Sequence, residues 1–312
     1  MRRSRASRDK GTPGLSSTEH PFDRFAARRR PAIEEALARA LPAAVAGAPA
    51  LARAMSDAVL SPGKRLRPLV ALAAGVLVRA PEAAAMASAV AVELVHAASL
   101  VLDDLPSMDD ARRRRGRPAL HVTWGVATAE LASVALLSRA FESVAEAPDV
   151  GAAARARMAG ELAAAVGAAG CCGGQAADLG ADPARLSLED LEAIHSRKTG
   201  ALFVAAVRCG ALAGGARESA LRSLTLFARN LGLAFQITDD LLDLEGDPER
   251  MGKDTLRDGH RANFATLFGA ASSRELVEEL LEAASAALEP FPARAPRAVL
   301  ADLARVVRDR RS

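Results

Sequence analysis

The most constraining feature of the sequence is a long and nearly all-apolar segment, residues 82–103. Its apolar side chains, such as Leu94 and Val101, recur at the spacing of a helix rather than in the alternation of a strand. A helix that is apolar nearly all round is typical of a central, buried position. Glu93 and His96 interrupt the run, so we expect no membrane span here.

The rest of the chain also predicts helices. They are expected at 126–146, 151–169, 188–213, 217–246, 273–288 and 296–309, with the glycine-rich residues 170–174 as a break or a point of close packing. Prolines, beginning with Pro31, divide the first third of the chain into pieces of helix length. Aromatic residues make up only 3% and no strand-turn-strand pattern occurs, which argues against a β-sandwich or barrel. We therefore predict an all-α fold.

Residues 1–20 differ from the rest of the chain in charge. Residues 1–10 contain four arginines and a lysine against one aspartate, a net charge of +4, whereas the whole chain carries +3. We therefore expect a disordered basic tail at 1–20, a single domain at 21–312, and no nucleic-acid-binding surface. The cysteines are odd in number and residues 1–20 lack the apolar core of a secretory signal, so we expect a cytoplasmic protein.

Two groups of aspartates follow apolar helical runs. The first group contains Asp103, Asp104, Asp109 and Asp110, and the second contains Asp239, Asp240 and Asp243. Asp239 and Asp243 are four residues apart and share a helix face, whereas Pro106 disrupts the first helix, so that a turn must bring Asp109 back. Carboxylates beside apolar residues are costly without cations, and oxygen-only ligands favour a hard cation, usually Mg²⁺. One such group could equally be a solvated helix end, but two favour a metal-binding site.

Basic side chains are clustered in the same way. The motif at 63–68 holds Lys64, Arg65 and Arg67, the run 112–115 is all arginine, Lys198 precedes Thr199, and Lys253 follows the second aspartate group. Arginine offers paired hydrogen bonds to phosphate and lysine a compact charge, so we expect these groups to bind a phosphorylated substrate. A basic run by itself is more often solvated surface, and His96 by itself would be interpreted as a core residue.

In their order along the chain, these motifs resemble those of the polyprenyl diphosphate synthase family, the trans-prenyltransferases. The resemblance covers residues 25–270 and rests on Gly-Lys-Arg-Leu-Arg-Pro, both aspartate groups, Lys-Thr-Gly and Gly-Lys-Asp. Ala-Ser-Leu-Val-Leu-Asp-Asp-Leu-Pro-Ser-Met-Asp-Asp and Arg-Arg-Gly-Arg-Pro-Ala-Leu-His are most similar to bacterial carotenoid-type geranylgeranyl diphosphate synthases. One departure is Arg261, where the family usually has a lysine.

The resemblance implies an isoprenoid-synthase-like bundle of helices around a central cavity, with both aspartate groups facing it. It implies Mg²⁺, as three ions when substrate is bound, on Asp103, Asp109, Asp239 and Asp243. The allylic diphosphate would contact Arg114, Lys198, Thr199, Gln236 and Lys253, and isopentenyl diphosphate would contact Lys64, Arg67, His96 and Arg115. The implied catalytic side chains are Asp103, Asp104, Lys198 and Asp239, with Asp240 in support and with Gln175 and Asp178 lining the pocket.

The implied reaction is head-to-tail condensation of isopentenyl diphosphate with an allylic diphosphate, by a homodimer. Ala98 and Ser99, one turn before Asp103, are small, so we expect a cavity deep enough for geranylgeranyl diphosphate as the product. A farnesyl diphosphate synthase is the alternative. A class I terpene cyclase is disfavoured because its second metal motif is missing, and a non-catalytic subunit because both aspartate groups are present. A purely structural bundle would not need these carboxylates.

Overall fold

The apolar segment forms a single helix, α4 (Glu82–Asp103), with the bounds that the sequence predicts. Most of its side chains between Ala84 and Val101 are buried, including the charged Glu93, which is 3% exposed. Among the described residues, α4 is the one helix that is long and apolar enough to cross a membrane. However, 67% of its most apolar stretch is buried inside the protein, which is what a core helix requires.

The computed structural model describes residues 20–245 and 263–310, in which nearly all regular structure is helical. The other helices are α1 (Pro21–Ala40), α2 (Pro49–Val59), α3 (Leu66–Leu77), α5 (Leu120–Trp124), α6 (Val126–Ala145), α7 (Ala152–Val166), α8 (Cys171–Gly180), α9 (Leu188–His195), α10 (Ala201–Ala213), α11 (Glu218–Glu245), α13 (Phe264–Phe268), α14 (Ala270–Ala286), α15 (Ala295–Ala301) and α16 (Leu303–Arg308). A single π-helical turn, Ser196–Gly200, joins α9 to α10. Within these ranges the only strands, β1 (Arg113–Arg114) and β2 (Arg117–Pro118), form an antiparallel ribbon that the sequence did not predict.

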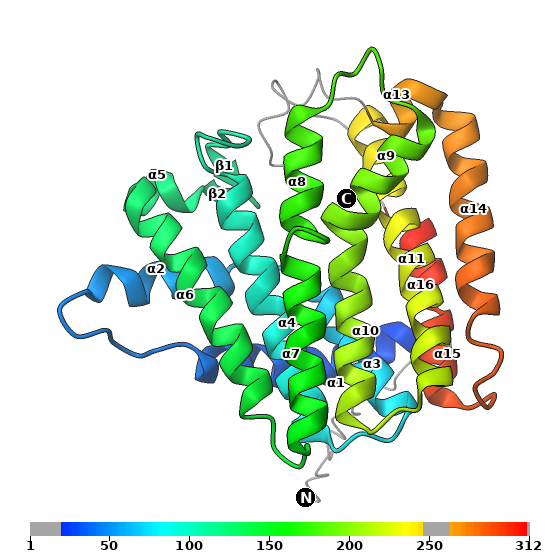
Figure 1. Ribbon diagram of the computed structural model, residues 1–312, viewed down its shortest axis with the longest axis horizontal. Coiled ribbons are helices and arrows are strands. Elements are labelled where there is room, and N and C mark those ends of the chain that lie inside the picture. The colour runs from blue at the N-terminus through cyan, green and yellow to red at the C-terminus, as the bar shows by residue number, and fades with distance from the viewer. Residues whose placement is uncertain (1–19, 246–262, 311–312) are drawn as a thin grey trace, which may run out of the picture.

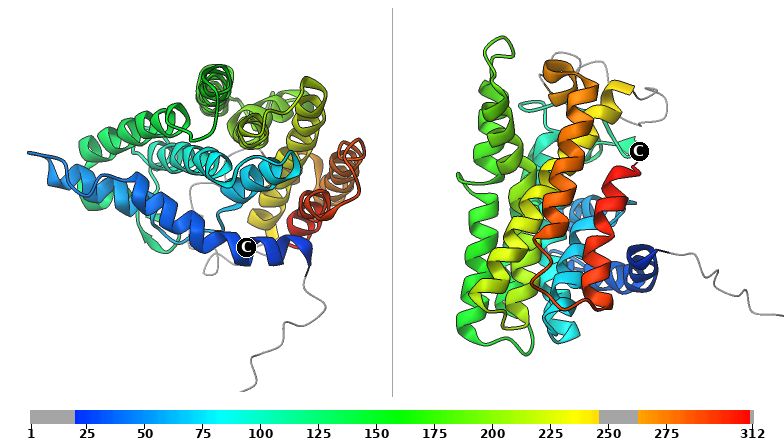
Figure 2. Two further views of the ribbon diagram at one scale, coloured as in Figure 1. Left: turned by 90° about the horizontal axis from the view of Figure 1, so that it is seen from below. Right: turned by 90° about the vertical axis from the view of Figure 1, so that its right-hand side faces the viewer.

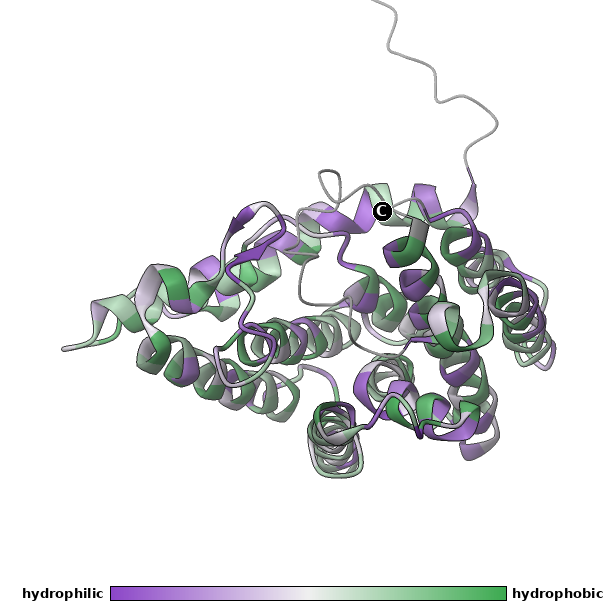
Figure 3. Cartoon of the chain, turned by 90° about the horizontal axis from the view of Figure 1, so that it is seen from above, coloured by the Kyte–Doolittle hydropathy of each residue, from purple (hydrophilic) through white to green (hydrophobic). Residues whose placement is uncertain are grey.

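Helix α4 lies at the centre of the bundle (Figure 1). It packs against α1, α2, α3, α6, α7 and α10, which confirms the position expected from its apolar surface. Helix α11 packs against α10 and also against α13, α14 and α16. Figure 2 shows that α1 crosses the bundle, whereas α4, α6, α7, α10 and α11 run along a common axis. Figure 3 shows hydrophobic residues on the helix sides that face one another, and one continuous core runs from Phe22 to Val307.

Some predicted helix boundaries are wrong. Pro31 does not end a helix but lies inside α1, on its exposed side, where water can bond the carbonyl that loses its donor. The helix predicted over 296–309 is divided at Asp302 into α15 and α16. The predicted tail at 1–20 lies outside the described residues except for His20.

The glycine-rich segment 170–174 shows both of the alternatives that the sequence left open. The helical structure is interrupted between Val166, where α7 ends, and Cys171, where α8 begins. Gly174 then packs against the backbone of the π-helical turn, because a Cβ at this position would lie only 2.3 Å from the amide nitrogen of Lys198. Glycine therefore lets α8 approach the turn more closely than any side chain would allow.

The space around two glycines predicts opposite effects on stability when each is replaced by alanine. A Cβ on Gly210 of α10 would lie 2.1 Å from the carbonyl oxygen of Ala71 in α3. Gly210→Ala should therefore force the helices apart and lower the free energy of unfolding by about 1–3 kcal/mol. Gly160 lies inside α7 with nothing within 4 Å of its Cβ position, so Gly160→Ala should raise stability by about 0.5–1 kcal/mol. Urea unfolding measures both changes, and equal stabilities of the two variants would contradict this close approach.

Candidate active site

The first aspartate group lies at the carboxyl end of α4. The helix ends at Asp103, shortly before Pro106, which cannot continue it. The chain then turns back, and the backbone N–H of Asp109 donates to the carbonyl of Asp103 over 2.9 Å. This contact confirms the predicted turn. Asp103 and Asp109 are therefore neighbours, and both side chains are half-buried.

The environment of Asp103 disfavours the ionised form of its carboxyl group. Burial raises the pKa of Asp103 to about 6, and the negative charge of Asp109 contributes in the same direction. The positive charges of Lys198 and Arg114 oppose this shift without cancelling it. A bound cation would stabilise the ionised carboxylates, because an opposite charge within a few ångströms favours the charged form.

Asp104 holds an arginine of the β-ribbon. Arg114 donates from Nε to both carboxylate oxygens of Asp104, over 3.0 and 3.1 Å, and the Asp104 side chain is only 4% exposed. Arg114 thus lies beside the first aspartate group, although its guanidinium is already bound by a carboxylate. On this side of α4 there is also a cavity of about 330 Å³, lined by Asp104, Arg114, Leu100, Val101 and Leu120 among others.

The turn of the ribbon places Arg115 over the loop before α3. Arg115 and Gly116 both have positive φ, 52° and 76°, as a tight two-residue hairpin turn requires. Arg115 Nη1 donates to the carbonyl of Pro62 over 3.0 Å. A Cβ on Gly63 would lie 2.7 Å from the same nitrogen, so the glycine of this motif leaves room for the arginine.

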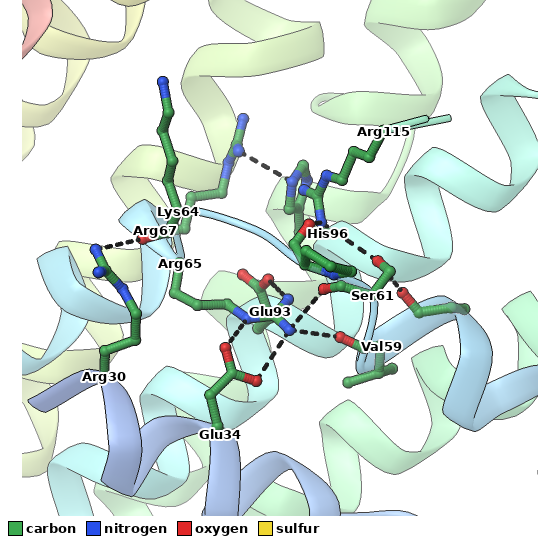
Figure 4. A network of polar contacts seen from close by, with 12 residues as sticks. Arg30, Glu34, Val59, Ser61, Lys64, Arg65, Arg67, Glu93, His96 and Arg115 are labelled. Carbon is green, nitrogen blue, oxygen red and sulfur yellow. Dashed lines mark hydrogen bonds and ion pairs between the residues drawn. The ribbon is translucent and has the colours of Figure 1, made fainter. Parts of the chain in front are cut away.

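The loop before α3 separates its basic residues onto two sides (Figure 4). Arg65 has a left-handed backbone, with φ of 51°, and its side chain, 2% exposed, points into the core. There it donates to Glu93 of α4 over 2.7 Å and to Glu34 of α1 over 2.8 Å. It also donates to the carbonyls of Val59 and Ser61. The sequence grouped Arg65 with the phosphate-binding cations, which is wrong, because two carboxylates and two carbonyls engage this guanidinium.

Lys64 and Arg67 point to the other side of that loop (Figure 4). Arg67 Nη1 lies 3.3 Å from His96 Nε2, and its guanidinium carbon lies 4.8 Å from the ring centroid of Phe203. Burial, and then the charges of Arg67 and Arg115, hold the pKa of His96 well below its usual range, so its imidazole is neutral. The structure thus brings together the four residues that the resemblance assigns to isopentenyl diphosphate.

The π-helical turn presents Lys198 and Thr199 next to α8. Lys198 Nζ lies 2.5 Å from Asp178 Oδ2, and its side chain is one-quarter exposed. Gln175, one turn earlier on α8, is buried, and its amide makes no hydrogen bond to the described residues. π-helical turns occur frequently at functional sites. Here the turn places Lys198 close enough to the first aspartate group for its charge to act on Asp103.

A chain of hydrogen bonds runs from the π-helical turn to the second aspartate group. Thr199 Oγ1 donates to Gln236 Oε1 over 2.7 Å, and Gln236 Nε2 donates to Asp240 Oδ1 over 3.0 Å. The backbone N–H of Phe264 donates to the other oxygen of Asp240, also over 3.0 Å. Burial raises the pKa of Asp240 to about 6. Asp240 is therefore a buried link between α11 and α13 rather than an accessible carboxylate.

Asp239 and Asp243 are on the accessible side of α11. Asp239 is 29% exposed and forms an ion pair of 2.7 Å with Arg310, a residue that the sequence analysis missed. Asp243 is exposed. In the described ranges no three His, Cys, Asp or Glu side chains converge on one point, so a metal here would also need oxygen atoms from water or substrate, as Mg²⁺ often does. Lys253 and Arg261 lie outside the described residues.

Both aspartate groups lie at the same end of the bundle, the upper end in Figure 1. Shared neighbours connect them. Burial raises the pKa of the Cys171 thiol to about 11, and the charges of Arg67 and Asp103 both act on that thiol. Arg67 in turn lies within reach of the charge of Asp239. Each group thus has cations beside it, Lys198 and Arg114 near Asp103 and Lys64 and Arg67 near Asp239, as a site for a polyanionic substrate requires.

Comparisons with known proteins give a consistent result. Residues 48–289 match the family model described as Polyprenyl synthetase. The chain is 40% identical over 285 residues to the chloroplastic geranylfarnesyl diphosphate synthase of Leucosceptrum canum. This alignment covers 89% of this chain and 78% of the relative. It is 43% identical over 240 residues to the farnesyl diphosphate synthase of Escherichia coli (strain K12), with 75% and 80% covered. The crystal structure of an FPP/GFPP synthase from Zymomonas mobilis superposes with a TM-score of 0.81 at 31% identity, covering 91% of this chain and 98% of that one.

The hydrogen-bond chain predicts a stability difference between two substitutions of Thr199. Thr199→Val keeps the shape but removes the donor to Gln236, so it should lower the free energy of unfolding by about 1–3 kcal/mol. Thr199→Ser retains the hydroxyl and should lose less than about 1 kcal/mol. Chemical denaturation monitored by circular dichroism measures both. If the valine and serine variants are equally stable, this hydrogen bond does not hold the π-helical turn to α11.

Proposed function

The chain belongs to the polyprenyl synthetase family and is a prenyltransferase that elongates prenyl chains, and we propose that it condenses isopentenyl diphosphate head-to-tail with an allylic diphosphate to give geranylgeranyl diphosphate. The family and the all-α isoprenoid synthase fold expected from the motifs are thus confirmed. The observation that carries the reaction is the position of two carboxylate groups, each with cations beside it, at one end of the helical bundle.

We propose that Asp103, Asp109, Asp239 and Asp243 bind Mg²⁺, with three ions present when substrate is bound. The donor set fits this ion, because every ligand is a carboxylate oxygen, and the charges of Asp103 and Asp109 lie close enough to repel one another. When bound, Mg²⁺ supplies positive charge that stabilises the departing diphosphate. Asp104 and Asp240 would position neighbours instead, since both are buried and hydrogen-bonded within the protein.

The remaining cations would divide between the two substrates. Isopentenyl diphosphate would bind Lys64, Arg67, His96 and Arg115, whose closeness in Figure 4 supports this assignment. The arginines offer paired N–H groups to phosphate oxygens, and a neutral His96 adds one further donor. This grouping would fix the alkene of isopentenyl diphosphate relative to the other substrate.

The allylic diphosphate would bind Lys198, Thr199, Gln236, Arg114 and Lys253, next to the carboxylates. Asp178 would orient Lys198, and Asp104 would orient Arg114, so that both cations already point at the charge that develops as diphosphate leaves. The alkene of isopentenyl diphosphate would attack the allylic carbon as the bond between that carbon and diphosphate breaks, and the new chain would then lose a proton to the released diphosphate. The apolar helices around the site would exclude water, which would otherwise react with the allylic cation.

Product length depends on the side chains beneath Asp103. Ser99 is half-buried on the same face of α4 as His96 and Asp103. Ala98 is completely buried, and its carbonyl accepts a hydrogen bond of 3.0 Å from Ser133 of α6, so of the two small residues only Ser99 borders accessible space. A serine here supports a product longer than farnesyl diphosphate. The two relatives named above are named for products on either side of geranylgeranyl diphosphate.

We further propose that residues 21–312 act as one catalytic domain, in a cytoplasmic homodimer. Leu131 and Val134 of α6 are 60% and 62% exposed, and a second copy of the chain would bury them. The cysteines of the described residues are all free, which fits a reducing compartment.

The proposed function predicts dependence on a divalent cation and on Asp103. EDTA should abolish the incorporation of labelled isopentenyl diphosphate with every allylic primer, and Mg²⁺ should restore it. Asp103→Asn should lower kcat by about a hundredfold or more without lowering the free energy of unfolding. Asp110→Asn removes a charge from the same group at a residue with no assigned role, and should keep most of the activity.

The outcomes of this assay distinguish the alternatives. Turnover of Asp103→Asn near that of wild type would refute the metal assignment. Failure of the wild-type enzyme to extend any primer would refute the proposed reaction. Farnesyl diphosphate as the sole product would replace the geranylgeranyl assignment with the shorter-chain alternative.

A substitution at Ser99 should shorten the product. Ser99→Phe places an aromatic ring on the accessible face of α4 one turn below Asp103, so elongation should stop near farnesyl diphosphate. Chromatography of dephosphorylated products gives the ratio of chain lengths. Ser99→Ala keeps the space open and should retain the wild-type ratio. An unchanged ratio in the phenylalanine variant would mean that the growing chain does not pass Ser99.

A further inference from the structure

A cation from a distant part of the sequence, Arg310, lies next to the second aspartate group. Arg310 lies two residues after α16, and its Nη1 is 2.7 Å from Asp239 Oδ1. Its guanidinium carbon lies 4.0 Å from the ring centroid of Phe235. Phe235 and Asp239 are one turn apart on α11, so one guanidinium contacts both of them. The Arg310 side chain is 13% exposed, which makes it part of the site rather than of the outer surface.

Charge rather than hydrogen-bond geometry holds Arg310 in this place. Its Nε and Nη1 atoms are buried and make no hydrogen bond to the described residues, despite the short distance to Asp239. Buried guanidinium groups normally satisfy their N–H donors. The ion pair therefore compensates the charge of Asp239, while two nitrogen atoms of Arg310 have no hydrogen-bond partner among the described residues, so another cation could replace it.

Arg310 is also close to cations of the same site. Burial, and then the charge of Arg310, lower the pKa of Lys64. Arg67, whose pKa is lowered mainly by burial, is repelled by Arg310 as well. Like charges at short range raise the free energy of this arrangement, and Asp239 is a carboxylate that acts on both Lys64 and Arg67.

Helix α16 does not depend on this ion pair to stay docked. Arg308 Nε donates to both oxygens of Glu278 in α14, over 2.7 and 2.9 Å. Arg305 binds Asp302 over 2.9 Å and Asp23 of α1 over 2.7 Å. Arg310 can therefore leave Asp239 while α16 keeps its other contacts.

We propose that Arg310 competes with the divalent cation for Asp239: in the ligand-free enzyme its guanidinium supplies the positive charge at this carboxylate, and metal binding displaces it. The inference rests on the proposed function, because it takes Asp239 as a metal ligand. It assigns Arg310 a role in setting metal affinity, and it couples occupancy of the second aspartate group to release of the Arg310 side chain from Asp239.

Titration with Mn²⁺ tests this competition without turnover. Electron paramagnetic resonance measures free Mn²⁺ in the presence of the full-length enzyme and no substrate. Arg310→Gln should bind Mn²⁺ about threefold to tenfold more tightly than wild type, since a partly buried competing charge is lost. Arg308→Gln, a matched substitution that breaks only the Glu278 pair, should bind as wild type does. In an Asp239→Asn background, Arg310→Gln should produce no gain.

Three results would overturn the proposal. The first two leave the proposed metal site intact, whereas the third refutes both. Equal affinities of wild type and Arg310→Gln would mean that Arg310 does not compete with metal. Weaker Mn²⁺ binding by Arg310→Gln would mean that Arg310 assists metal binding instead. If Asp239→Asn binds Mn²⁺ as wild type does, then Asp239 is not a metal ligand, and the proposed metal site fails together with this inference.

Discussion

The buried ion pairs of the Arg65 guanidinium are the interactions on which the positions of Lys64 and Arg67 depend. The guanidinium joins Glu93 in the middle of α4 to Glu34 of α1, and its hydrogen bonds to two backbone carbonyls fix the loop before α3. Breaking a buried pair of this kind by removing one partner typically costs about 3–5 kcal/mol, so the loop has one strongly preferred arrangement. Because the left-handed backbone at Arg65 turns its side chain inward, Lys64 and Arg67 are presented to the site before any substrate binds.

The site combines two kinds of carboxylate, which differ in burial although they are adjacent in sequence. Asp104 and Asp240 are buried and hydrogen-bonded by the protein, so each fixes an element: the β-ribbon in one case and α13 in the other. Asp103 and Asp239 are more exposed and face the cations. One residue of each Asp-Asp pair thus supports the structure while its neighbour is available for chemistry, because successive residues on a helix point about 100° apart.

The sequence was sufficient for the elements whose apolar spacing is regular, and for residues recognised by motif. Helix α4 was predicted to the residue, and the turn after Pro106 followed from the chemistry of proline. The sequence could not separate Arg65 from its neighbours, because that difference depends on a single left-handed φ and on carboxylates from two distant helices. Arg310 was missed for a similar reason: it carries no motif, and only the packing of α16 on α11 brings it to Asp239. Pro31 was misjudged because exposure, which sequence alone does not give, decides whether a helix tolerates proline.

The contact of Gly174 with the backbone of Lys198 makes α8 and the π-helical turn a single mechanical unit. With no side chain between them, a tilt of α8 cannot be absorbed by a change of rotamer and must shift the turn itself. Through Thr199 and Gln236 such a shift would reach Asp240, so strain at the free end of α8 would be transmitted across the bundle. Through Gly174, the distance between the π-helical turn and the second aspartate group thus becomes sensitive to the position of α8.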